Sequence, residues 1–164
     1  MKTKKEYFYE ETGKHIRNVH LVMEQIVADL LAQARRHDIS KYSPEEADLF
    51  AKVTPELSKS EYGSAEYKKN LAKIEPAIKH HHSMNRHHPE HWKQGVKDMT
   101  LMELLEMLAD WIAASKRNPN GDILASIDKN QERFGYSDEL KVILKQTACQ
   151  LDDLTKKMEK HSEF

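Results

Sequence analysis

Apolar residues recur every three or four positions along several long stretches of this chain. The clearest stretch runs from Ile16 to about Ala34, and similar patterns cover residues 67–78, 101–112 and 140–154. This spacing places apolar side chains on one face of an α-helix. No alternating run is long enough for a β-sheet. The sequence therefore predicts an all-α fold, a single compact bundle of six or seven helices.

Capping signals and helix breakers predict where some helices begin and end. Ser43-Pro44-Glu45-Glu46 has an N-cap residue, a proline in the first turn and a capping-box glutamate, so we expect a helix from there to about Val53. Residues 54–63 are expected to form a loop. Thr100-Leu101-Met102-Glu103 is a second capping box. Residues 1–12 are expected to form either a short helix or an N-terminal arm.

Composition limits the classes of protein that the chain can belong to. Its 164 residues fit one domain, residues 1–164, and a formal net charge of −1 gives no overall attraction to nucleic acid or anionic lipid. No apolar run approaches the ~20 residues of a membrane span, and the polar start lacks a signal peptide's apolar core, so we expect a cytoplasmic protein. Cys149 is the only cysteine, which excludes an internal disulfide and a cysteine-rich zinc site.

Histidines gather in one short segment. Six of the ten histidines lie in residues 80–91: His80, His81, His82, His87, His88 and His91. Neutral imidazole is the commonest metal ligand in proteins, so this density predicts metal binding or proton transfer. Because Pro89 disfavours a helix past His88, the histidines are expected to span a helix end and the following turn.

Three further signals fit a metal site with nitrogen and oxygen ligands. His37 and Asp38 are adjacent, Asp110 lies in a leucine-rich helical pattern, and His15 adjoins the apolar face of an earlier one. These four residues would supply two nitrogen and two oxygen ligands from three helices. One or two divalent ions would fit, and Mn, Fe, Zn, Co, Ni and Mg all stay open. Lys41 and Arg86 are placed to meet an anionic substrate such as a phosphate.

The order His15, His37-Asp38, Asp110 resembles the HD-domain superfamily of metal-dependent phosphohydrolases, and His37-Asp38-Ile39-Ser40-Lys41 is similar to its H-D-I-G-K motif. The resemblance implies an HD-domain-like helical fold, a bound divalent metal and hydrolysis of a phosphoester, most often in a nucleotide. It also implies that one of His80 and His81, and one of His87 and His88, bind a second ion. Glu106 has no counterpart in that superfamily, and we expect it to accept a hydrogen bond from a ligand histidine.

A closer likeness covers nearly the whole chain. The runs His37-Asp38-Ile39-Ser40-Lys41, Asn85-Arg86-His87-His88-Pro89-Glu90-His91 and Arg133-Phe134-Gly135 are similar to a family of small bacterial and phage proteins of unassigned function. Three functions are therefore left open. The first is a phosphohydrolase with a small phosphorylated substrate, the second is a di-iron oxygenase, and the third is a non-catalytic protein that binds a nucleotide or a partner. A homodimer is also left open.

Overall fold

The computed structural model describes residues 2–57, 59–60, 64–117 and 121–161, with the side chains of the last helix described as far as Leu151. These residues form seven α-helices and three short 3₁₀ helices and include no strand. The all-α prediction is confirmed. The chain divides into two units, Met1–His37 and Asp38–Phe164, which are described separately below. That the two make one domain stays a prediction.

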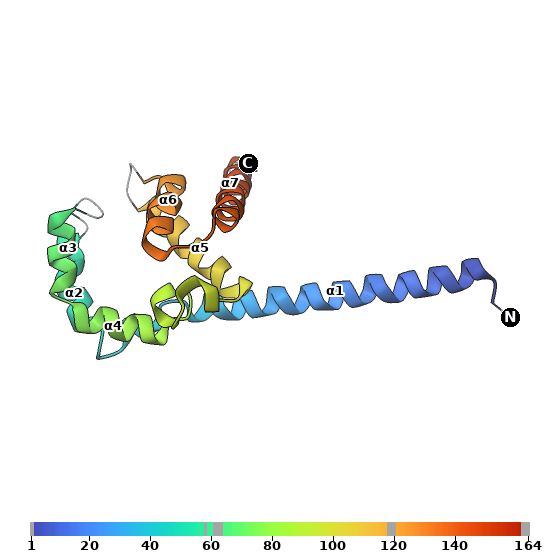
Figure 1. Ribbon diagram of the computed structural model, residues 1–164, viewed down its shortest axis with the longest axis horizontal. Helices are drawn as coiled ribbons and strands as arrows, with labels where there is room; N and C mark the ends of the chain where they lie inside the picture. Colours follow the sequence, from blue (N-terminus) through green and yellow to red (C-terminus); the bar gives the residue numbers. More distant parts are fainter. Residues whose placement is uncertain (1, 58, 61–63, 118–120, 162–164) are drawn as a thin grey trace. The chain divides into compact units, whose positions relative to one another are not determined.

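The first unit is a single long helix, α1 (Lys4–Arg36), shown in blue in Figure 1. Thr3 and Glu6 close a capping box at its start, so residues 4–12 form its first turns rather than a separate short helix or arm. The expected apolar stripe is present, but α1 has no buried residue. Its exposed apolar side chains include Tyr7, Phe8, Tyr9, Ile16, Val19, Leu21, Val22, Met23, Val27 and Leu31.

The second unit contains all the remaining elements. In chain order these are η1 (Ile39–Tyr42), α2 (Ala47–Leu57), α3 (Ala65–Ala72), α4 (Glu75–Met84), η2 (Pro89–His91), η3 (Gly95–Asp98), α5 (Leu101–Lys116), α6 (Ile123–Phe134) and α7 (Asp138–His161). Helices α5, α6 and α7 contact one another, and α2 contacts α3, which in turn contacts α4. These two groups of helices are separate in Figure 1.

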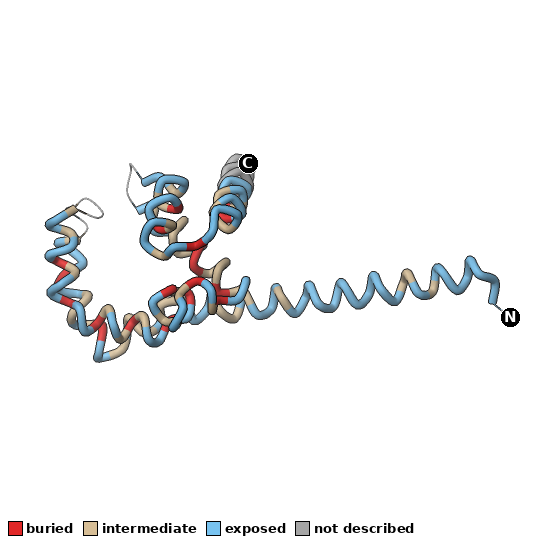
Figure 2. Tube along the Cα trace, viewed as in Figure 1, coloured by how far each residue is buried: buried red, intermediate tan, exposed pale blue. Residues whose placement is uncertain are grey.

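Each group of helices has its own apolar core. The larger core includes Met107, Leu108 and Ile127, and the smaller one consists of Val53, Ile74 and Ala77 with their half-buried neighbours. Full burial of one such large apolar side chain contributes ~1.5–3 kcal/mol to folding. Figure 2 shows further buried residues at the end of α4 and in the segment that follows it, among them His81, Asn85 and His87. The histidine-rich segment therefore joins the two cores.

Several helix boundaries differ from those that the local signals predicted. Helix α2 begins at Ala47 instead of Pro44, because residues 43–46 form a turn in which Glu46 is buried. It also continues past Val53 to Leu57, so Pro55 lies inside it, and part of the expected loop at 54–63 is helical. The rest of that loop includes residues 58 and 61–63, which lie outside the described residues.

Other boundaries agree with the local signals. Glu103 accepts a hydrogen bond from the Thr100 N–H at 2.6 Å, so the second capping box is present at the start of α5. Helix α6 ends at Gly135, whose φ of 64° is the left-handed conformation that glycine adopts without a steric penalty. These features fix where α5 begins and where α6 ends, and both helices contact the histidine-rich segment through side chains described below.

Candidate metal centre

Asp38 lies at the start of η1 and has an unusual backbone. Its φ of 56° and ψ of 15° are left-handed, a conformation that no other described non-glycine residue adopts. Aspartate tolerates this conformation better than most residues do. Lys41, three residues later, donates a hydrogen bond to Asp38 Oδ2 at 2.5 Å. This ion pair holds one carboxylate oxygen and leaves Oδ1 facing the histidines.

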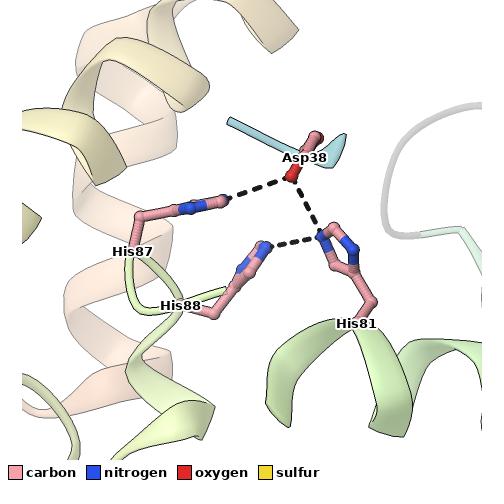
Figure 3. Close-up of side chains that lie close together, drawn as sticks. All are labelled: Asp38, His81, His87 and His88. Carbon is pink, nitrogen blue, oxygen red and sulfur yellow. Dashed lines mark hydrogen bonds and ion pairs between the residues drawn. The ribbon is translucent and has the colours of Figure 1, made fainter. Parts of the chain in front are cut away.

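Four donor atoms converge on one point, as Figure 3 shows. Asp38 Oδ1 lies 3.2 Å from His81 Nε2 and 3.5 Å from His87 Nε2. His88 Nε2 lies 2.9 Å from His81 Nε2. One ligand atom from each of these four residues lies within 4.8 Å of the other three. His81 comes from the last turn of α4, and His87 and His88 come from the turn that follows it.

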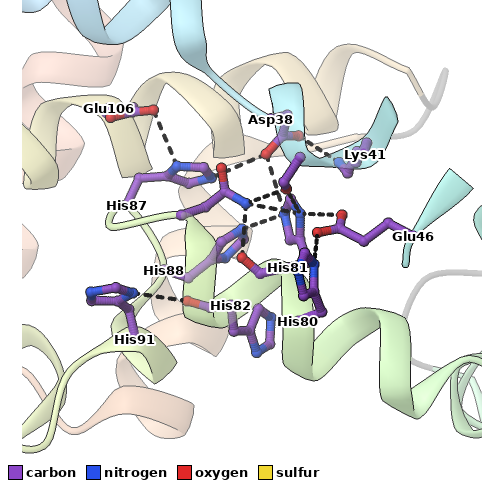
Figure 4. A network of polar contacts seen from close by, with 12 residues as sticks. Asp38, Lys41, Glu46, His80, His81, His82, His87, His88, His91 and Glu106 are labelled. Atoms are coloured by element: carbon purple, nitrogen blue, oxygen red, sulfur yellow. Dashed lines mark hydrogen bonds and ion pairs between the residues drawn. The ribbon is translucent and has the colours of Figure 1, made fainter. Parts of the chain in front are cut away.

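Two carboxylates, one buried and one half-buried, fix which nitrogen carries the proton in two of these rings. Glu46 Oε2 lies 3.0 Å from His81 Nδ1, and Glu106 Oε1 lies 3.1 Å from His87 Nδ1 (Figure 4). A carboxylate accepts hydrogen bonds, so each Nδ1 carries the proton and each Nε2 presents a lone pair. Two nitrogen lone pairs and an aspartate oxygen that face one another repel unless a cation lies between them. The four residues could therefore hold a metal ion, with the two carboxylates orienting two of the rings.

The surroundings of His88 favour the neutral form of its imidazole. Burial, together with the nearby His87, His81 and His82, lowers the pKa of His88 to about 2, against the opposing effect of Asp110. The two other rings are almost fully buried, with exposed fractions of 5% for His81 and 2% for His87. A neutral imidazole needs no deprotonation before it binds a metal.

The structure also places the remaining predicted residues of this unit. His80 lies 2.7 Å from Glu46 Oε1 and is not among the four converging donors, so it is His81 that joins the site. Both His87 and His88 join it. Glu106 makes the contact to a ligand histidine that its position on the helix face suggested. Asp110, one turn further along α5, is half-buried and acts electrostatically on His88.

The expected pairing of His15 with His37 as ligands of one ion is wrong for this structure. His15 lies in α1 and His37 directly follows its last residue, 22 residues further along an unbroken helix, which corresponds to ~33 Å along the axis. Ligands of one ion lie within a few ångström of each other, so these two residues of one chain cannot share an ion. His15 is exposed. His37 follows the last residue of α1 and precedes Asp38, and its role as a ligand stays a prediction.

The two predicted substrate contacts differ in their surroundings. Lys41 pairs with Asp38 at the edge of the site, and 38% of its side chain is exposed. The Arg86 guanidinium instead pairs with Glu103, at 2.6 Å from NH2 to Oε1, and lies over the Trp92 ring at 4.2 Å. Although burial raises the pKa of Glu103, its hydrogen bonds to Thr100 and Arg86 lower it more, so this carboxylate is charged. The Arg86 guanidinium therefore has two structural partners, the Glu103 carboxylate and the Trp92 ring.

A second group of donors lies further out and shares one ligand with the first. His82, His88 and Glu90 each present a ligand atom within 4.8 Å of the others. His82 is half-buried, with its ring centroid 4.8 Å from that of His88. Arg133 pairs with Glu90 at 2.5 Å, however, and His88 Nε2 already faces the inner group. The outer group is consequently the weaker of the two candidate sites.

Sequence reasoning missed Glu46 as a member of the site. Its position after Ser43 and Pro44 had a sufficient local explanation as a capping-box residue. The same is true of Ser40 and Asn85: Asn85 Nδ2 donates to Ser40 Oγ at 2.7 Å, and the Ser40 hydroxyl lies 3.2 Å from His81 Nδ1. No local pattern marks residues that meet a ligand only through packing.

These observations define an all-α protein with a candidate metal centre of three histidines and one aspartate. The chain belongs to a family of unknown function, DUF5662, whose model matches residues 4–157. No curated protein and no solved structure matches the chain. Among the described residues no helix combines the length and apolar character needed to cross a membrane. The resemblance to the HD-domain superfamily stays a prediction.

Proposed function

We propose that this protein is a metal-dependent phosphohydrolase that acts on a nucleotide or a related small phosphoester. The observation that supports the proposal is the convergence of Asp38, His81, His87 and His88 on one point, with two of the rings oriented by carboxylates. Residues that hold metals for catalysis have this kind of support, because the orienting group raises the basicity of the ligand and fixes its direction.

The donor set favours particular metals. Three imidazole nitrogens and one carboxylate oxygen suit zinc, iron, cobalt or nickel, whereas magnesium and calcium prefer sites made of oxygen. The charge of the set is also low, since the imidazoles are neutral and Asp38 supplies the one formal negative charge among the four. We therefore expect a divalent transition-metal ion or zinc in the protein as it is purified.

The residues around the site have separable roles in hydrolysis. A bound divalent ion would supply Lewis-acid chemistry, which acidifies water and polarises a phosphoryl oxygen. Lys41 holds Asp38 in place and presents a half-exposed ammonium beside the site, where it would meet the negative charge of a phosphate. Asp38 and His88 are half-buried, whereas His81 and His87 are buried. Substrate would therefore approach from the side of Asp38 and His88.

Elemental analysis followed by an activity screen tests the proposal. Protein purified without added metal is expected to contain about one equivalent of a metal other than Mg or Ca per chain. It is then expected to release phosphate or nucleoside from at least one member of a nucleotide and phosphoester panel. Asp38→Asn should lose both the metal and this activity, and Lys41→Gln, once it is loaded with metal, should lose most of this activity. Metal-loaded protein with no turnover across the panel would contradict the proposal.

The number of donors supports a second candidate, a non-catalytic protein. Four protein ligands are the complement of a closed tetrahedral zinc site, which has no position for water or substrate. In that case the ion would stabilise the junction between α4 and α5, and the protein would bind its ligand or partner elsewhere. A melting temperature that rises with one nucleotide, without any turnover of it, would favour this function.

A further inference from the structure

His87 and His88 lie in a short turn, residues 85–91, which we call the ligand turn. Arg86 and Glu90 lie on either side of the two histidines in this turn. We propose that two ion pairs of opposite polarity, Arg86 with Glu103 and Glu90 with Arg133, hold the ligand turn in its metal-binding geometry. Arg86 and Arg133 are then positioning residues. This inference depends on the metal site proposed above but not on its hydrolytic activity.

The first ion pair ties the ligand turn to the start of α5. Arg86 Nε and NH2 lie 2.8 Å and 2.6 Å from Glu103 Oε1, while the other oxygen of this buried carboxylate binds the Thr100 N–H. Trp92 also contacts Arg86. Its Nε1 donates a hydrogen bond to the Arg86 carbonyl at 2.8 Å, and its ring lies under the guanidinium. Both the backbone and the side chain of Arg86 are thereby fixed.

The second ion pair ties the far end of the ligand turn to the end of α6. Arg133 NH2 lies 2.5 Å from Glu90 Oε1. The Arg133 guanidinium lies 4.7 Å from the centre of the Phe134 ring, which stacks on Trp111 of α5 with an interplanar angle of 7°. The Arg133-Phe134-Gly135 run thus has a structural role, since it anchors the ligand turn to the larger core.

The spacing of acidic residues on α5 joins the first ion pair to the metal ligand. Glu103 and Glu106 are three residues apart and lie on the same face of the helix. Consecutive residues of the ligand turn contact them in the same order: Arg86 binds Glu103, and His87 Nδ1 binds Glu106. A shift of Arg86 would therefore move the His87 ring away from Glu106 and away from Asp38.

This arrangement makes the ligand turn rigid before an ion arrives. Ordering a flexible turn on binding costs conformational entropy, whereas a turn already held by its neighbours binds without that cost. The affinity for metal should therefore depend on Arg86 and Arg133, although neither residue is a ligand.

The sign of the expected effect separates positioning from simple electrostatics. Arg86→Gln and Arg133→Gln each remove a positive charge near a cation site, so electrostatics alone predicts tighter metal binding. Loss of positioning predicts weaker binding, by about 10- to 100-fold, as is usual for outer-shell partners of a metal. We would titrate Co²⁺ into the metal-free full-length variants and follow the visible absorption of the cobalt complex.

Lys145→Gln is the matched control. Lys145 also belongs to an ion pair with α6, 2.7 Å from Asp128, but this pair joins α6 to α7 and does not contact the ligand turn. This variant should bind Co²⁺ with a dissociation constant within about two-fold of that of the original protein, because loss of the Lys145–Asp128 pair does not move the ligands. Circular dichroism would confirm that all three variants are folded.

A double-mutant cycle identifies the partner of each arginine. If Glu90 acts through Arg133, Glu90→Gln combined with Arg133→Gln should weaken Co²⁺ binding no more than either substitution alone. Glu103→Gln tests the other pair, since glutamine can still serve the capping box. Unchanged or tighter Co²⁺ binding by Arg86→Gln and Arg133→Gln would overturn the inference while leaving the metal site intact. Failure of the unsubstituted protein to bind Co²⁺ would instead overturn the site and the inference together.

Discussion

The Glu46 carboxylate contacts His80 and His81 at once, with 2.7 Å from Oε1 to His80 Nδ1 and 3.0 Å from Oε2 to His81 Nδ1. Glu46 is completely buried, so this carboxylate has exchanged water for two imidazole N–H donors. It comes from the turn before α2, far along the chain from α4. The contact makes Glu46 the residue that determines which nitrogen of His81 is available to a metal.

Replacement of Glu46 tests this role. In Glu46→Gln the amide oxygen can accept a hydrogen bond from one imidazole N–H. The amide NH2 is a donor, so it cannot accept a hydrogen bond from the N–H of the other ring. We expect metal affinity to fall by about 10- to 100-fold while the helical content is kept. Titration with Zn²⁺ in the presence of a competing chelator would measure the metal affinity. Glu45→Gln, at the exposed neighbouring position, should have no effect, and equal affinities for the two variants would show that Glu46 does not orient His81.

Asp38 should be essential for metal binding but not for folding. Asp38→Asn keeps the shape of the side chain and tolerates the left-handed backbone, yet it replaces one carboxylate oxygen by an NH2 group that cannot bind a cation. We expect metal content to fall from about one equivalent to almost none, with a change in unfolding free energy of about 1 kcal/mol or less. Retention of a full equivalent by folded Asp38→Asn would remove Asp38 from the ligand set.

His81 and His82 are adjacent, and their substitution should have very different results. His81→Ala removes a nitrogen ligand and the partner of Glu46, so it should abolish tight metal binding. His82→Ala removes a ring from the outer group alone, where Glu90 is already neutralised by Arg133. We expect almost no change in the metal content of His82→Ala. Mass spectrometry of the native proteins would compare the two, and a loss of metal in His82→Ala would show that the outer group is the binding site.

Tyr136 should make stability depend on pH in the alkaline range. Burial raises the pKa of Tyr136 to about 12, with a smaller contribution from Asp128, and its hydroxyl donates to the Ile127 carbonyl. Because the folded protein favours the protonated phenol, the stabilisation is complete below the ordinary pKa of ~10 and is lost as the pH rises towards about 12.

The variant Tyr136→Phe removes both the hydrogen bond and this pH dependence. We expect it to be ~1 kcal/mol less stable than the original protein near pH 8. The difference should shrink between pH 10 and 12, which urea unfolding at pH 8 and pH 11 would measure. A difference that is the same at both pH values would show that the Tyr136 hydroxyl does not titrate in this way.

Helix boundaries and faces were largely predictable because they depend on neighbouring residues. The capping box of Thr100 and Glu103, the end of α6 at Gly135 and the shared face of Glu106 and Asp110 all follow from spacing within one or two turns. The same local density of histidines indicated the segment that holds three of the four converging donors. Even the exclusion of His15 could have been derived, because one unbroken helix separates it from His37.

The sequence by itself therefore determined an all-helical chain and a histidine-rich turn next to an acidic helix face. Only the tertiary structure decided that Glu46 is part of the site, that Arg86 pairs with Glu103, and that His81 rather than His80 faces Asp38. The physical reason is range. Hydrogen bonds within a helix or turn act over a few residues, whereas the pairing of buried charges depends on which distant segments the packing of the core brings together.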